Sequence, residues 1–93
     1  MEQPKPNISV IIATTCEAKR RESLRRAIDS VFTQEGVDVE LIIVVNGDRF
    51  DAQMLKELKS NPNLKVHYLP EANVSAARKF GKSVASKEFF FIS

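Results

Sequence analysis

The stretch N-I-S-V-I-I-A-T-T-C, residues Asn7–Cys16, decides the fold. Four branched aliphatic residues stand in it with only Ser9 between them, and small polar residues follow. A half-exposed strand alternates apolar and polar residues, so this run predicts a strand with apolar cover on both faces. In a short chain, such a strand is usually the centre of a parallel sheet with helices on both sides. Thr14, Thr15 and Cys16 then lie at its carboxyl end, where open α/β sheets bind ligands.

Length and composition predict a single globular domain. The chain has 93 residues, of which 43% are hydrophobic and 28% are charged, and both values are ordinary for a soluble protein. The net charge of +2 gives no reason to expect nucleic acid or an anionic membrane as a partner. Basic residues gather in Lys19–Arg26, but Glu22 and Asp29 are interleaved at helical spacing, so we interpret this run as a solvated helix face.

Cysteine usage and hydropathy indicate the setting of the chain. A single cysteine excludes an internal disulfide and a cysteine-rich metal site, and it fits a reducing, cytoplasmic location. No apolar run approaches the roughly 18 residues of a membrane-spanning helix. Residues 1–6 combine two prolines with charges and lack the apolar stretch of a signal peptide, so we expect a disordered lead-in there and one folded unit over residues 7–93.

Short apolar runs alternate with helical patterns along the chain. After the first strand, which begins at Asn7, we predict these elements: helix Ser23–Gln34, strand Val39–Val45, helix Ala52–Lys59, strand Leu64–Leu69, helix Val74–Ala85 and strand Glu88–Ile92. Gly36 is placed to end the first helix. Asp51 can cap the second helix, and Asn73 or Ser75 can cap the third.

Each of the three predicted helices carries apolar residues that predict its inner face, and in the second helix these are Met54, Leu55 and Leu58. In the first, the stripe consists of Leu24, Ala27, Ile28, Val31 and Phe32. In the third, it consists of Ala77, Phe80, Gly81 and Val84. A glycine inside a helix costs about 1 kcal/mol relative to alanine, so we interpret Gly81 as the point where this helix approaches the sheet closely.

This order of elements predicts an α/β fold of three layers. Helices between successive strands imply parallel pairing with right-handed crossovers, and we expect a four-stranded parallel sheet of order 3-2-1-4. Every strand-to-helix loop of a parallel sheet opens on one edge, which brings together Thr14–Cys16, Asn46–Asp48, Pro70–Asn73 and Ser93. The order reverses between the first and fourth strands, which places a crevice beside Thr14 and Ser93.

Two polar residues at this edge suit a nucleotide. Asn46 offers a donor and an acceptor to a nucleobase, although the Asn46-Gly47 pair is also ordinary turn chemistry, which we favour on pattern alone. Arg78 follows the first turn of the third helix, where it could reach a phosphate or stack on a base, and a surface arginine is an equal alternative.

Other reactive residue types are better read as structural. His67 lies within a strand and has no partner at ligand spacing, and nothing near Cys16 in sequence would lower its pKa, so we interpret that cysteine as a small filler. The chain has neither a G-x-G-x-x-G nor a G-K-[ST] phosphate loop, so a standard dinucleotide site and a P-loop are not supported. It also shows no carboxylate pair and no serine nucleophile elbow.

Five segments, in order and suitably spaced, resemble the nucleotide-binding half of a family 2 glycosyltransferase of the GT-A fold. The resemblance covers about Asn7–Ser93. The segments are I-S-V-I-I-A-T-T-C, L-R-R-A-I-D-S-V-F-T-Q, E-L-I-I-V-V-N-G-D, L-P-E-A-N-V-S-A-A-R-K-F-G and K-E-F-F-F-I-S. They resemble, in turn, the opening strand, the Leu-x-x-x-Leu-x-Ser-Val-x-x-Gln helix, the strand before Asp-Asp-Gly-Ser, the Asn-x-Gly-x-Ser-x-Ala-Arg-Asn-x-Gly helix and the strand that leads into Asp-x-Asp.

The resemblance implies a nucleotide diphosphate sugar, most often a UDP-sugar, as the donor. Thr14 and Thr15 would line the base and ribose, Asn46 would meet the uracil edge, and Arg78 would lie near the base and diphosphate. This sequence departs from the family pattern where Val45 and Asn46 replace the two aspartates, which puts the base preference in doubt. It also departs where Ala13 replaces a proline and Thr15 and Cys16 replace tyrosine and asparagine, which alters the packing against the base.

The resemblance also implies the reaction of a longer parent protein. In the family, Mn²⁺ or Mg²⁺ binds the Asp-x-Asp motif that follows the last strand, and a base from the acceptor-binding half activates a hydroxyl of the acceptor, which is a glycan or a lipid-linked sugar. Transfer inverts the sugar configuration. Because the sequence stops at Ser93, we expect a fragment that is inactive alone, with no catalytic residue and no metal ligand.

Two further expectations concern self-association and location. The run Phe89–Phe91 would form an apolar edge strand, so we expect self-association through Glu88–Ser93. A longer parent would be cytoplasmic or would act at the inner face of a membrane.

Two other functions stay open, namely a non-catalytic nucleotide- or anion-binding module and a receiver-like signalling domain. The receiver reading is disfavoured because Ala13–Thr15 and Leu69-Pro70 stand where receivers need acidic residues.

Overall fold

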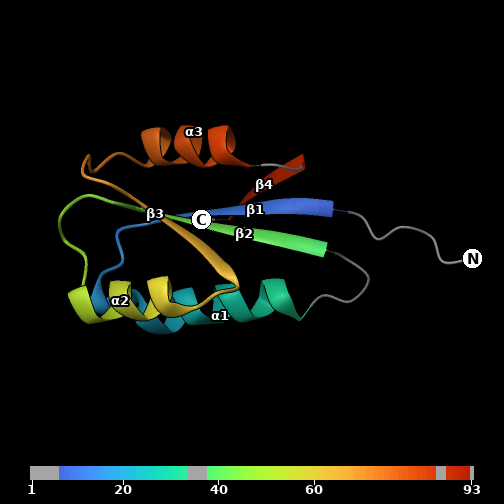
Figure 1. Cartoon of the computed structure of the whole chain (residues 1–93). Coiled ribbons are helices and arrows are strands. Elements are labelled where there is room, and N and C mark those ends of the chain that lie inside the picture. Colours follow the sequence, from blue (N-terminus) through green and yellow to red (C-terminus); the bar gives the residue numbers. More distant parts are fainter. Residues whose placement is uncertain (1–6, 34–37, 86–87, 93) are drawn as a thin grey trace, which may run out of the picture.

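The computed structural model describes residues 7–33, 38–85 and 88–92, except for the side chains of Asn7, Asp38 and residues 88–92 (Figure 1). Its elements are β1 (Asn7–Thr14), the 3₁₀ turn η1 (Ala18–Arg20), α1 (Arg21–Phe32), β2 (Asp38–Asn46), α2 (Ala52–Ser60), β3 (Leu64–Leu69), α3 (Val74–Val84) and β4 (Glu88–Ile92). The predicted α/β class and parallel sheet are confirmed. The lead-in of residues 1–6 lies outside the described residues.

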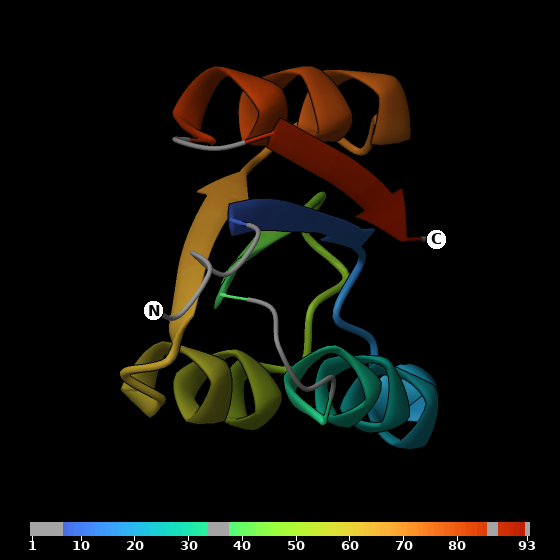
Figure 2. The same ribbon diagram turned by 90° about the vertical axis from the view of Figure 1, so that its right-hand side faces the viewer.

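The sheet places β1 between β2 and β4. The strands lie in the order β3-β2-β1-β4, and every neighbouring pair is parallel. β1 pairs with β2 along its whole length, as far as Thr14 opposite Val45. On its other side, the last described pair joins Ile12 to Ile92. Helices α1 and α2 cover one face of the sheet and α3 covers the other, as Figures 1 and 2 show.

Burial on both faces explains why the two inner strands have continuous apolar runs. Val10 and Ile12 pack on the side of α1 and α2, whereas Ile11 packs on the side of α3 with Ala77. All five residues of Leu41–Val45 are at most 1% exposed. A strand between two helical layers has no solvated face, so neither strand alternates apolar with polar residues.

Side-chain caps fix where α2 and α3 begin. The Asp51 carboxylate accepts a hydrogen bond from the Met54 N–H at 2.9 Å, and the Asn73 side chain accepts one from the Ala76 N–H at 3.1 Å. Asn73, rather than Ser75, is therefore the cap of α3. Helix α1 begins two residues before the predicted start because η1 leads into it, and it ends at Phe32 with Thr33 as its C-cap. Gly36, predicted to end this helix, lies outside the described residues.

Two inner-face predictions are wrong. Phe32 is 43% exposed and Val84 is 36% exposed. Phe32 follows Leu24 by eight residues, which turns it about 80° around the helix and places it at the margin of the stripe. Val84 is the last residue of α3, at the end of its layer. The remaining predicted inner residues are buried or half-buried.

The close approach predicted at Gly81 is confirmed. A Cβ built on Gly81 would overlap the Cγ2 methyl of Ile11 on the central strand. Because Gly81 has no side chain, α3 can lie directly on β1 at this point. Self-association through Glu88–Ser93 stays a prediction, because those side chains and Ser93 lie outside the described residues.

We predict that Gly81→Ala lowers the free energy of unfolding by about 1–2 kcal/mol, because the overlap with Ile11 outweighs the gain in helix propensity. At an ordinary helix position the same change would stabilise by about 1 kcal/mol, so the sign is diagnostic. The measurement is urea unfolding followed by circular dichroism.

Two variants make this test specific. In an Ile11→Leu background, which removes the branched Cγ2 methyl at nearly constant volume, Gly81→Ala should become neutral or stabilising. Lys79→Ala, at an exposed position of α3, should change stability by less than about 0.5 kcal/mol. Stabilisation by Gly81→Ala in the wild-type background would contradict the contact.

Candidate functional site

Three loops meet at the carboxyl edge of the sheet and are hydrogen-bonded to one another. The Gly47 N–H donates to the Leu69 carbonyl at 2.9 Å, which joins the end of β2 to the end of β3. Gly47 has a φ of +85°, as its predicted turn position requires. The Asp51 N–H donates to the Cys16 carbonyl at 2.8 Å, which joins the loop after β1 to the cap of α2. The edge is therefore one connected unit.

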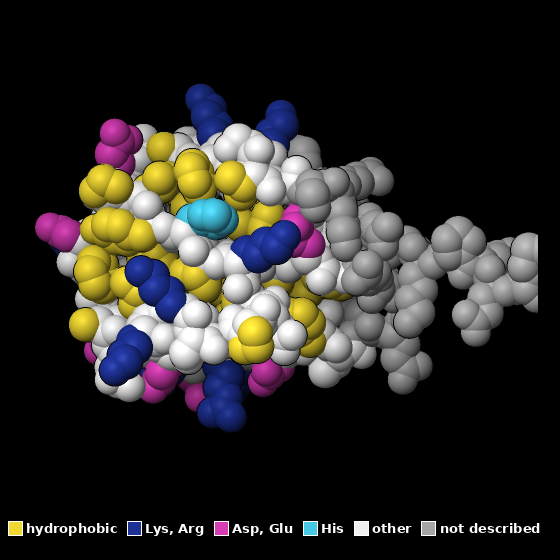
Figure 3. Space-filling model, in the orientation of Figure 1, with side chains coloured by type: hydrophobic (Ala, Val, Ile, Leu, Met, Phe, Trp, Pro, Cys, Tyr) yellow, Lys and Arg dark blue, Asp and Glu magenta, His cyan; other side chains and the backbone are white. Residues whose placement is uncertain are grey.

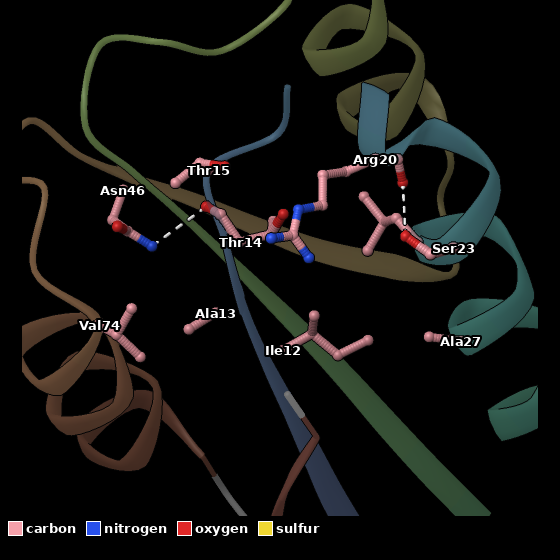
Figure 4. A pocket seen from close by; sticks show the side chains of 10 residues that line it. Ile12, Ala13, Thr14, Thr15, Arg20, Ser23, Ala27, Asn46 and Val74 are labelled. Atoms are coloured by element: carbon pink, nitrogen blue, oxygen red, sulfur yellow. Dashed lines mark hydrogen bonds between the residues drawn. The ribbon is translucent and has the colours of Figure 1, made fainter. Parts of the chain in front are cut away.

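A hollow of about 280 Å³ opens at this edge, beside Thr14 as predicted (Figure 4). It straddles the sheet, because Ile12 belongs to the layer of α1 while Ala13 packs toward α3. Ser93, expected on its other side, lies outside the described residues. The described residues that line the hollow come from β1, the loop after it, η1, α1, β2 and α3. They are Ile12, Ala13, Thr14, Thr15, Arg20, Ser23, Leu24, Ala27, Asn46 and Val74.

The two threonines at the end of β1 present complementary groups. The Thr14 hydroxyl oxygen accepts from the Cys16 N–H at 3.0 Å, so its own proton is available to a ligand. The Thr15 hydroxyl donates to the Glu17 carboxylate at 2.8 Å, so its lone pairs remain as acceptors. This bond lowers the pKa of Glu17, and the charges of Lys19, Arg49 and Arg20 lower it further.

Asn46 is buried at the end of β2, with 2% exposure. Its side-chain N–H donates to the Thr14 carbonyl at 3.1 Å, across to the neighbouring strand (Figure 4). This bond gives Asn46 a structural role beyond turn chemistry, because it holds the ends of β1 and β2 together. The amide oxygen of Asn46 adds an acceptor group to the hollow that the same residue lines.

Comparison with known families adds a second line of evidence. The sequence model described as Glycosyl transferase family 2 matches residues 9–93. The chain belongs to this family. No curated protein and no solved structure gave a significant match. The resemblance drawn from the five sequence segments is thus confirmed for family 2.

In this family 2 glycosyltransferase chain, Arg78 is not among the described residues that line the hollow. It is half-buried in α3, four residues after Val74, which does line the hollow. The structure therefore brings Thr14, Thr15 and Asn46 together and leaves Arg78 outside the cavity as it stands.

The structural interpretations of Cys16 and His67 agree with their surroundings. Cys16 is fully buried at a φ of +57°. Burial raises the pKa of its thiol, and the nearby Asp51 carboxylate raises it further, so the thiol stays protonated. His67 is half-buried, with its ring edge-to-face on Phe80 at 5.1 Å between centroids. The histidine of this chain is seen among hydrophobic side chains in Figure 3.

Sequence reasoning missed Arg20 and Ser23 as parts of this edge. Both line the hollow, whereas the sequence placed Arg20 on a solvated helix face. Their position, directly after the carboxyl end of a buried strand and at the start of a helix, was the signal that could have marked them. The Ser23 hydroxyl donates to the Arg20 carbonyl at 3.1 Å, which orders the turn that carries Arg20.

The described residues contain neither a cluster of metal-ligand side chains nor a helix that could cross a membrane. Within the described ranges, no group of three or more His, Cys, Asp or Glu side chains is placed to hold a metal ion. Among the described helices, none has both the length and the apolar character needed to cross a membrane.

We predict that Asn46→Asp destabilises the fold by about 1–3 kcal/mol at neutral pH, because a buried carboxylate would face the Thr14 carbonyl oxygen instead of donating to it. The folded state would raise the pKa of the new carboxyl above the unfolded value of about 3.9. The native state then binds more protons, so stability falls as pH rises through this interval.

Unfolding at pH 4.5 and pH 7.5 measures this difference, and the deficit relative to wild type should be smaller at pH 4.5. Asn63→Asp is the matched control, because Asn63 is exposed in the turn before β3 and its substitution should cost less than about 0.5 kcal/mol. Equal effects of the two substitutions would argue against the Asn46–Thr14 bond.

We further predict that Thr15→Val raises the pKa of Glu17 toward its ordinary value, because the hydrogen bond to the carboxylate is lost. In wild type the lowered pKa means that this contact stabilises the loop at neutral pH and is lost as pH falls through the folded pKa. Carboxyl carbon shifts in an NMR pH titration report both values. Thr33→Val, on an exposed threonine at the end of α1, should leave the Glu17 midpoint unchanged. An unchanged midpoint in Thr15→Val would refute the assignment.

Proposed function

We propose that this chain forms the donor-binding half of a glycosyltransferase that uses a nucleotide diphosphate sugar, with a UDP-sugar as the first candidate. The observation that carries the proposal is the hollow at the carboxyl end of the central strands, where Thr14, Thr15 and Asn46 converge in a family 2 chain. Open α/β sheets bind ligands at this edge.

The groups in the hollow suit the nucleoside part of such a donor. The Thr14 hydroxyl can donate and the Thr15 hydroxyl can accept. Each ribose hydroxyl can do both, so either threonine can bind one. The amide oxygen of Asn46 can accept from an N–H at the edge of a uracil ring. Ala13 and Val74 add apolar surface for the ring. The volume of about 280 Å³ suits a nucleoside, with the diphosphate and sugar extending outward.

The proposed reaction is a single displacement with inversion at the anomeric carbon. A bond forms from the acceptor hydroxyl oxygen to that carbon as the bond from the carbon to the phosphate oxygen breaks. The hydroxyl proton passes to a general base and the nucleotide diphosphate leaves. The acceptor would be a glycan or a lipid-linked sugar. No described residue has a catalytic role in this proposal.

Arg78 stays within the proposal as a residue near the base and diphosphate. It lies in α3, the helix whose first residue, Val74, lines the hollow. The proposal predicts that the backbone amide signal of Arg78 shifts when the nucleotide binds. This shift is measured in the same titration as the shifts of the residues that line the hollow.

Titration of the ¹⁵N-labelled chain with UDP tests the proposal. We expect amide shifts at Thr14–Cys16, Asn46–Asp48 and Arg78, with weak affinity and equal size with and without Mn²⁺. Thr15→Val should weaken UDP binding several-fold through the loss of one hydrogen bond, and Thr33→Val should not. Binding of pyrophosphate with the same shifts and affinity as UDP would instead favour a general anion-binding module. No shifts at millimolar UDP would contradict the proposal.

A further inference from the structure

Arg20 places a positive charge in the hollow. It is the last residue of η1 and the N-cap of α1, and its backbone carbonyl accepts the Ser23 hydroxyl at 3.1 Å. Figure 4 shows its side chain reaching from this turn into the hollow in the direction of Thr14. Of the described residues that line the hollow, Arg20 alone carries a charge, while the others offer hydroxyl, amide or apolar groups.

The adjacent arginines Arg20 and Arg21 differ in their ion pairs. The guanidinium of Arg21 pairs with the Glu57 carboxylate at 2.6 Å and with Asp51 at 3.9 Å, which ties α1 to α2. In the described part of the chain, no ion pair joins Arg20 to a carboxylate. The charge of Arg21 is therefore engaged in ion pairs between two helices, whereas the charge of Arg20 is available to a ligand.

Two further cations, Lys19 and Arg49, lie near Arg20 at this edge. The charges of Lys19, Arg49 and Arg20 all lower the pKa of Glu17, so three cations from the loops after β1 and β2 lie within electrostatic reach of one carboxylate. Asp48 and Asp51 lie on the same loop as Arg49, but neither they nor Glu17 is among the described residues that line the hollow. An anionic group that enters the hollow is consequently attracted toward the side where Arg20 stands.

We propose that Arg20 binds the phosphate groups of the nucleotide and so supplies the preference for a nucleoside diphosphate over an uncharged nucleoside. The proposal rests on the nucleotide-binding function proposed above. A guanidinium presents several N–H donors in one plane and can hold two phosphate oxygens at once. When Arg20 binds the phosphates, three neutral groups remain to bind the nucleoside. They are the hydroxyls of Thr14 and Thr15 and the side-chain amide of Asn46.

The test compares uridine, UMP and UDP as ligands of the wild-type chain and of Arg20→Gln by titration calorimetry. Wild type should bind UDP more tightly than uridine. Arg20→Gln should weaken UDP binding by about fivefold or more, the effect of losing a charge pair at a partly exposed site, and should change uridine binding by less than about twofold. Arg20→Lys, which keeps the charge but loses the planar donors, should fall between the two.

Arg26→Gln is the matched control, because it makes the same change of charge on an exposed residue of α1, the helix that Arg20 precedes, outside the hollow. It should leave the affinities for UDP and uridine within about twofold of wild type. The fold of each variant is checked by circular dichroism, and the exposed position of Arg20 makes unfolding an unexpected result.

The outcomes separate this proposal from the function on which it rests. If wild type binds uridine and UDP but Arg20→Gln binds UDP as tightly as wild type, the role of Arg20 is refuted and the nucleotide site stands. Equal losses for uridine and UDP in Arg20→Gln, or equal losses of UDP in Arg20→Gln and Arg26→Gln, refute it as well. If wild type binds neither ligand, both proposals fail.

Discussion

The contact between α3 and the central strand is the constraint on which the rest of the structure depends. Ile11 on β1 is fully buried beneath α3, and only a residue without a side chain fits above its Cγ2 methyl, at Gly81. This contact fixes how closely the helix lies on the sheet. Helix α3 carries Val74 at its other end, so the same contact sets the position of one wall of the hollow.

Hydrogen bonds between neutral backbone and amide groups join the strand ends and loops of the carboxyl edge. Asn46 joins β2 to β1, Gly47 joins β2 to β3, and Asp51 joins α2 to the loop after β1. These bonds restrain the ends of three strands with neutral groups. The charged residues of the same edge are consequently divided between helix packing, as for Arg21, and the hollow, as for Arg20.

Patterns along the sequence predicted what depends on local periodicity and on the rules of parallel sheets. The continuous run Leu41–Val45 indicated a strand covered on both faces, Asp51 indicated a cap, and the parallel arrangement placed a site beside Thr14. Such patterns could not predict contacts between residues that lie far apart in the sequence. The run Lys19–Arg26 looks uniform in sequence, and only the fold shows that Arg21 meets Glu57, 36 residues away. For the same reason, the bond from Asn46 to the Thr14 carbonyl could not be foreseen, and it changes the interpretation of Asn46 from a turn residue to a tie between strands.

The central place of β1 also shapes how the chain assembles. Of the four described strands, β1 is made before the other three and lies between β2 and β4, and its two edges are covered at very different times. β2 arrives within the next thirty or so residues, whereas β4 pairs with β1 only after α3 has been made. Until then, one edge of an apolar strand has unpaired backbone groups, and such edges promote wrong pairings during folding. The long interval between β1 and β4 therefore leaves this edge of β1 open for longer than the edge that β2 covers, and open to wrong pairing in a newly made chain.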